Sequence, residues 1–203
     1  MDIIEMIINS PAAVALITGL VTGFFTLNGV KKSNKYNIEL KNLQDLENTK
    51  HILIAFKEEI NQVYERFYSS IGKFIEDYDG TGFIDLITKC DQKYFSIYEN
   101  VSPKIGTIKD ENLIKSIIKT YTVGSGMIET MTMYSEIFEK YIDFVVYNNE
   151  KVNDITYQKI SASYYARLTK LTQEGLIKDY KFLTESKKET IGLIDKYLKN
   201  NYV

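Results

Sequence analysis

The sequence predicts an all-α protein with one N-terminal transmembrane helix and, behind it, a cytoplasmic bundle of about four long amphipathic helices. Three observations lead to this fold class. No charged side chain occurs from Met6 to Val30. Apolar residues in the rest of the chain recur every three or four positions, which is the period of a helix, and no segment shows the alternation of a half-buried strand. We therefore divide the chain into a membrane helix with its basic flank, residues 1–35, and a helical bundle, residues 36–203.

The uncharged stretch is long enough to cross a bilayer, because about 20 residues at about 1.5 Å each cover its hydrocarbon core. A secretory signal peptide would carry its positive charges before the apolar stretch, whereas Lys31, Lys32 and Lys35 follow it. A buried core helix is the remaining alternative. The three lysines predict a single-pass protein with its N-terminus outside and its C-terminal domain in the cytoplasm. The composition, with 23 lysines against two arginines, suggests a bacterial protein, so we expect it in the bacterial inner membrane.

Small residues of this helix gather on one face. Lipid does not distinguish one apolar face from another, but close helix packing needs small residues, and threonine can hydrogen-bond across such a contact. We expect self-association through this face, either as a dry bundle or around a narrow wet path; a single anchor with incidental small residues is the alternative. The predicted packing or pore-lining residues are Ala15, Thr18, Gly19, Thr22, Gly23 and Thr26.

The first helix after the span is predicted over 36–78, continuous with the span or closely following it, and it ends in the polar run 77–82. A second is predicted over 83–101, ended by Ser102 and Pro103 because proline disfavours helical geometry in the preceding residue. Asp110 can cap a third helix that runs to about 145, weakened in the middle by glycines. Asp154 can cap a fourth, which extends towards 198. Short loops between long helices favour a bundle.

Composition argues against an enzyme. The chain has a single cysteine, Cys90, and a single histidine, His51, so a disulfide within the chain is excluded and a histidine-based metal site or catalytic triad is not expected. No phosphate-binding glycine loop or hydrolase motif occurs. The net charge of −2 gives no bulk attraction to nucleic acid. We expect no catalytic residue and no cofactor.

The polar run 77–85 resembles the calcium-binding loop of EF-hand proteins. Asp77, Asp79 and Thr81 match the first three ligand positions of that loop and Asp85 a fourth. The loop departs from the family at its last position, where Thr88 replaces a bidentate glutamate. A plain polar turn is the alternative, and the resemblance implies at most a weak metal site.

A basic and aromatic surface is predicted on the fourth helix. Stacking on tyrosine together with phosphate contacts would suit a nucleotide or a short single-stranded nucleic acid. Tyrosines at this spacing also occur as ordinary core or rim residues. The candidate ligand-binding residues are Lys159, Tyr164, Tyr165, Arg167 and Lys170.

Two functional hypotheses follow. In the first, the protein is a homo-oligomeric membrane effector; in the second, it is a membrane-tethered helical scaffold that binds a protein partner without forming a pore. From Pro11 to Lys35, and in its overall architecture, the chain resembles the single-pass effectors of bacterial antiphage operons, such as the channel subunit of Hailong-type systems. This resemblance implies an ion channel in antiviral defence, gated by a nucleotide or oligonucleotide ligand that a partner enzyme makes.

Overall fold

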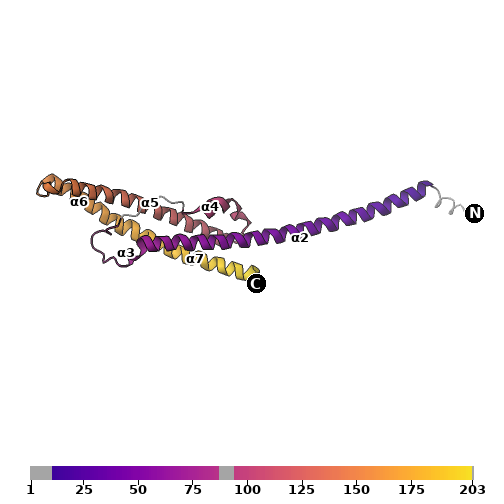
Figure 1. The fold of residues 1–203 in the computed structure, drawn as a ribbon. Coiled ribbons are helices and arrows are strands. Elements are labelled where there is room, and N and C mark those ends of the chain that lie inside the picture. The colour runs from indigo at the N-terminus through magenta and orange to yellow at the C-terminus, as the bar shows by residue number, and fades with distance from the viewer. Residues whose placement is uncertain (1–10, 87–93, 203) are drawn as a thin grey trace, which may run out of the picture. The chain divides into compact units, whose positions relative to one another are not determined.

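The computed structural model describes residues 11–86 and 94–202, and nearly all of them are helical (Figure 1). These described residues contain no strand, which confirms the predicted all-α class. The chain divides into two units, Met1–Asn48 and Thr49–Val203. This boundary lies within a helix, and it comes later in the chain than the domain boundary expected after residue 35.

Helix α2 (Pro11–Phe67) covers both the apolar stretch and most of the helix predicted over 36–78. Its described part begins at Pro11. Within the described part of the chain, α2 is the one helix that is long and apolar enough to cross a membrane. A π-helical turn (Tyr68–Gly72) and the short α3 (Lys73–Glu76) follow α2, and the helix ends there, as predicted.

The prediction of a helix over 83–101 is wrong in its N-terminal part. Residues 83–86 are not helical. The backbone N–H of Ile84 donates to the Thr172 hydroxyl at 3.3 Å, and the Tyr134 hydroxyl donates to the Ile84 carbonyl. These contacts with distant elements hold the segment in a non-helical conformation, which overrides its local pattern. Cys90 and Thr88 lie outside the described residues.

The helix that does form in this region is short. Helix α4 covers Ser96–Val101 and ends before Ser102, as predicted. The chain then continues as a 3₁₀ turn (Ser102–Thr107) with Pro103 near its start.

The two remaining helix starts are confirmed. The Asp110 carboxylate accepts from the backbone N–H groups of Asn112 and Leu113 and caps α5 (Glu111–Tyr147). Asp154 caps α6 (Ile155–Lys170) in the same way, through Thr156 and Tyr157. A 3₁₀ turn (Asn149–Lys151) separates these two helices, while a π-helical turn (Leu171–Leu176) joins α6 to α7 (Ile177–Tyr202).

Unit Thr49–Val203 contains two groups of buried apolar side chains. Within its described residues, the long helical runs are the C-terminal part of α2, α5, and α6 with α7. The first cluster includes Phe67, Met127, Met131, Leu168 and Leu176. The second includes Leu53, Phe56, Leu113, Ile117 and Ile194. The ring of Phe95, which precedes α4, packs against both clusters.

Candidate functional site

Almost every residue of the apolar stretch of α2 whose side chain the structure describes is exposed, and Ala13 alone among them is half-buried. None of its most apolar window is buried within the chain. Large side chains are as open as small ones: Leu16 is 65% exposed, Leu20 67% and Phe25 69%. Soluble proteins rarely expose a contiguous apolar surface of this extent, and such surfaces mark contacts with membranes or other proteins.

The predicted small-residue face lies on this exposed stretch. A Cβ atom added at Gly19 or Gly23 would meet no atom within 4 Å. Glycine costs about 1 kcal/mol relative to alanine inside a helix, and nothing in the described chain requires it at these two positions. Any packing role for the two glycines must therefore involve something other than the described residues of this chain.

The lysines that follow the apolar stretch are solvent-exposed. Lys31, Lys32 and Lys35 lie on the continuing helix α2. Lys35 approaches Glu39 at 4.0 Å, one helical turn further on, and both side chains are exposed. Exposed ion pairs of this kind contribute little to stability. The three lysines mark the position on α2 where the uncharged stretch ends and charged residues begin.

The structure brings together three of the five predicted ligand-binding residues. Lys159, Tyr164 and Arg167 line an open depression of about 400 Å³ along α6, together with Ile160 and Ser163. Both cationic side chains are exposed. The half-buried Tyr164 ring lies 6.2 Å from the Tyr141 ring and 6.0 Å from the Phe144 ring. The Tyr164 ring therefore packs against aromatic rings of α5 and forms one side of the depression.

Tyr165 and Lys170 do not line this depression. The Tyr165 ring lies 5.3 Å from the Phe83 ring in an edge-to-face arrangement, and Tyr165 borders a different hollow. Lys170 lines a neighbouring hollow with Arg167, where it pairs with Glu174 at 3.7 Å. Successive helical residues point about 100° apart, so Tyr164 and Tyr165 cannot offer one stacking surface.

The acidic loop is closed by its own hydrogen bonds. Asp79 Oδ1 accepts from the Thr81 backbone N–H at 2.8 Å and from the Thr81 hydroxyl at 2.7 Å. These bonds lower the pKa of the Asp79 carboxyl. Gly80 and Gly82 have φ values of +89° and +66°, the left-handed region that favours glycine in turns. Among the described residues, Asp77, Asp79 and Asp85 do not gather into a metal-binding group.

Helix α2 carries a buried carboxylate that the sequence pattern does not predict. Glu59 is only 5% exposed. Its two oxygens accept from the backbone N–H groups of Ile97 and Tyr98 at 2.6 and 2.9 Å, in the first turn of α4. The Tyr121 hydroxyl donates to the same carboxylate at 2.8 Å. The sequence feature that could have indicated this carboxylate is a glutamate among the regularly spaced apolar residues of the helix predicted over 36–78.

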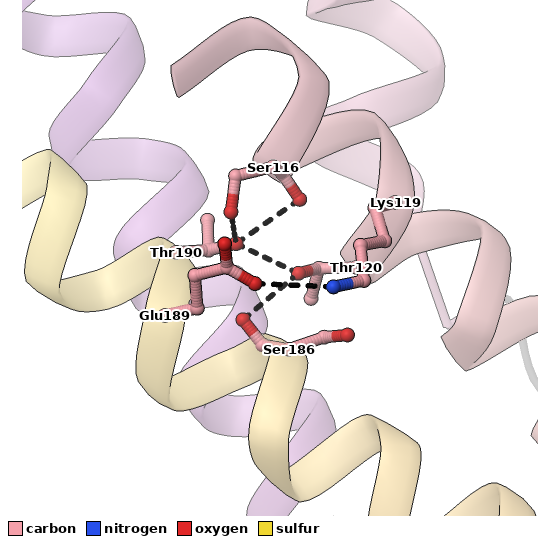
Figure 2. A network of polar contacts seen from close by, with 6 residues as sticks. All are labelled: Ser116, Lys119, Thr120, Ser186, Glu189 and Thr190. Carbon is pink, nitrogen blue, oxygen red and sulfur yellow. Dashed lines mark hydrogen bonds and ion pairs between the residues drawn. The ribbon is translucent and has the colours of Figure 1, made fainter. Parts of the chain in front are cut away.

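A cluster of buried hydroxyl groups between α5 and α7 was also missed (Figure 2). The Ser116 and Thr190 hydroxyls lie 2.6 Å apart, and those of Thr120 and Thr190 lie 2.8 Å apart. Thr120 also reaches the Ser186 carbonyl at 3.1 Å, and Thr190 reaches the Ser116 carbonyl at 3.0 Å. Three hydroxyl protons serve four contacts, so not all four bonds form at once. The sequence feature that could have indicated this cluster is a pair of hydroxyl residues four positions apart on each of two helices, Ser116 with Thr120 and Ser186 with Thr190.

An ion pair flanks this cluster at the surface. Lys119 donates to Glu189 at 3.1 Å, and both side chains are more than half exposed (Figure 2). The cluster and its flanking pair connect α5 to α7. We assign them a structural role.

Comparisons with known proteins found no match: no family model, no curated protein and no solved structure is similar to this chain.

Proposed function

We propose that the protein is a homo-oligomeric membrane effector, in which the apolar stretch of α2 crosses the inner membrane and assembles with copies of itself into a pore. The helical unit Thr49–Val203 senses a ligand on the cytoplasmic side, and that ligand controls the pore. The observation that carries the proposal is that none of the most apolar window of α2 is buried within the chain.

Energetics support a membrane environment for this stretch. Burying one leucine or phenylalanine side chain is worth about 1.5–3 kcal/mol, at about 25 cal/mol per Å² of apolar surface. Leu16, Leu20, Phe24, Phe25 and Leu27 are each 64–69% exposed. In water this surface would be highly unfavourable, whereas lipid or neighbouring helices would cover it.

Side-chain size supports assembly of copies within the membrane. Gly19 and Gly23 let helix backbones approach closely, and Thr18, Thr22 and Thr26 add hydroxyl groups to the same face. A monomeric anchor has no use for this arrangement. In an oligomer, the hydroxyls either hydrogen-bond between helices or line a narrow path for water and ions.

The depression on α6 is our candidate ligand site. Two exposed cations, Lys159 and Arg167, lie eight residues apart on α6 and line the same depression as Tyr164. Arginine binds phosphate oxygens with a planar fork of donors and lysine binds them as a point charge. A nucleotide or short oligonucleotide is the ligand class that this arrangement suits. The resemblance to antiphage channel subunits points to the same class.

A second candidate function is a membrane-tethered scaffold without a pore. One observation favours it: apolar side chains are exposed where α5 turns into α6. Tyr147 is 84% exposed, Ile155 67% and Val146 61%. A protein partner bound there would cover this surface.

Ion flux separates the two functions. The full-length protein is reconstituted into potassium-loaded vesicles, and potassium release is recorded with and without a mixture of nucleoside triphosphates and short single-stranded DNA. The effector proposal predicts release that changes when the mixture is added. No release above that of protein-free vesicles under either condition would favour the scaffold.

A further inference from the structure

A second exposed apolar face follows the lysines on α2. Tyr36 is 65% exposed, Leu40 44% and Leu43 63%. Their spacing of four and then three residues places them on one side of the helix. They follow Lys31, Lys32 and Lys35 in the polar part of unit Met1–Asn48, so in the proposed topology they lie outside the bilayer.

The register of this face continues into the apolar stretch. Steps of three and four residues back from Tyr36 reach Ser33, Gly29, Thr26, Thr22 and Gly19. A strict alternation of three and four is the seven-residue repeat of a left-handed coiled coil. In such a coiled coil, the side of α2 that carries Tyr36, Leu40 and Leu43 would lie in line with the small-residue face of the same continuous helix.

Charges beside the face fit a parallel pairing of two copies. In a parallel coiled coil, a residue that flanks the seam meets the residue five positions later on the other helix. Lys32 would thus meet Asn37 of the second copy, and Glu39 would meet Gln44 of the second copy. No like charges come together, although like-charge contacts would be costly.

On the side of this segment that carries Ile38, a parallel pairing does not avoid like-charge contacts. Ile38 is 61% exposed, so it is as open as the residues of the Leu40 face. At about 100° per residue, however, Lys31, Lys35 and Asp45 all lie within about 60° of Ile38. Parallel copies packed through Ile38 would bring identical charges together.

We propose that Tyr36, Leu40 and Leu43 form a parallel coiled coil between copies of this chain, which extends the membrane assembly into the cytoplasm. The inference rests on the proposed function for its parallel orientation, because helices that cross one membrane in the same direction must pair in parallel.

Thiol cross-linking of the full-length chain in membranes tests this coiled coil. Cys90 is first replaced by serine, so that each variant has one thiol. Leu40→Cys and Ile38→Cys are then compared, since both positions lie on α2, two residues apart, on different sides of the helix. Mild oxidation should convert Leu40→Cys into a covalent dimer at several times the yield of Ile38→Cys. Equal yields, a higher yield at Ile38, or no dimer from either variant would overturn the inference.

Flux measurements on the same samples keep the two proposals distinguishable. Cross-linking at Leu40 without ion flux leaves the coiled coil standing and removes the pore. Flux without preferential cross-linking at Leu40 removes the coiled coil and leaves the pore standing. Leu40→Glu with Leu43→Glu should reduce the oligomer at least several-fold relative to Ile38→Glu. An unchanged oligomer would contradict the inference.

Discussion

The Glu59 carboxylate accepts a 2.8 Å hydrogen bond from the Tyr121 hydroxyl, and the two side chains are 5% and 2% exposed. Through this carboxylate, α2 holds the first turn of α4 and the side of α5 at the same time. Buried charge is costly unless several donors satisfy it, and here three donors do so. Glu59 therefore fixes the position of α4 on the bundle.

Removing the carboxylate should destabilise the helical unit. Glu59→Ala leaves two backbone N–H groups and one hydroxyl without their acceptor, at a cost of about 2–4 kcal/mol. Glu59→Gln keeps one accepting oxygen and should cost about half as much. Thermal unfolding of the detergent-solubilised protein measures both, with the exposed neighbour Glu58→Ala as the control. Equal melting temperatures for Glu59→Ala and Glu58→Ala would show that Glu59 has no such role.

Stability should fall at alkaline pH because of buried tyrosines. Burial and the adjacent Glu59 carboxylate raise the pKa of Tyr121 far above 10, and burial raises the pKa of Tyr134 to about 12. A raised pKa favours the protonated form in the folded state. The stability from each tyrosine is therefore present below pH 10 and is lost as the pH rises above it, by about 1.4 kcal/mol per pH unit per group.

The comparison of wild type with Tyr121→Phe isolates one such group. Below about pH 9, the melting temperatures of the two proteins should differ by a constant amount. Above about pH 10, the melting temperature of the wild type should fall more steeply than that of Tyr121→Phe. Parallel curves over the whole range would contradict the assignment.

Two glycines of α5 should respond in opposite directions to alanine. A Cβ at Gly124 would lie 2.6 Å from Phe95 Cζ, whereas a Cβ at Gly126 would meet nothing within 4 Å. Gly126→Ala should stabilise the protein by about 0.5–1 kcal/mol through helix propensity. Gly124→Ala should destabilise it by about 1–2 kcal/mol, since the Phe95 ring must move within a packed core. Melting temperatures decide the matter, and a stabilised Gly124→Ala would disprove the close contact.

Several of these elements were predictable from local sequence. Asp110 and Asp154 cap their helices as predicted, because capping depends on a few neighbouring residues. The segment 83–86 was mispredicted because its conformation depends on Thr172 and Tyr134, which are distant in sequence. A local periodicity contains no information about such partners.

The candidate ligand site was only partly predictable. Helical spacing correctly places Lys159, Tyr164 and Arg167 around one depression. Tyr165 was included on the basis of sequence adjacency, although adjacent helical residues point in different directions and Tyr165 packs against Phe83. The role of Glu59 was not predictable, because its partners Ile97 and Tyr98 come from a helix whose start was predicted in the wrong place.

The α6 depression should bind anionic ligands. Fluorescence anisotropy with a labelled short single-stranded DNA should show binding that weakens as salt increases. Lys159→Ala with Arg167→Ala should reduce the affinity at least tenfold, since each phosphate contact contributes. Lys188→Ala with Lys196→Ala removes the same charge from exposed positions on α7 and serves as the control. If both double variants weaken binding equally, the attraction is a property of net charge and the site is not on α6.

The proposed pore depends on the small-residue face of α2, and the membrane potential of bacteria that express variants of the protein tests this proposal most directly. Wild type should depolarise the cells under whichever condition, presence or absence of the controlling ligand, opens the pore. Gly19→Leu with Gly23→Leu should abolish depolarisation by keeping neighbouring helices apart. Leu20→Phe with Phe24→Leu changes bulky residues outside the small-residue face and should leave depolarisation intact. If the double glycine variant still assembles and depolarises cells as wild type does, the small-residue face has no role and the proposed pore is wrong.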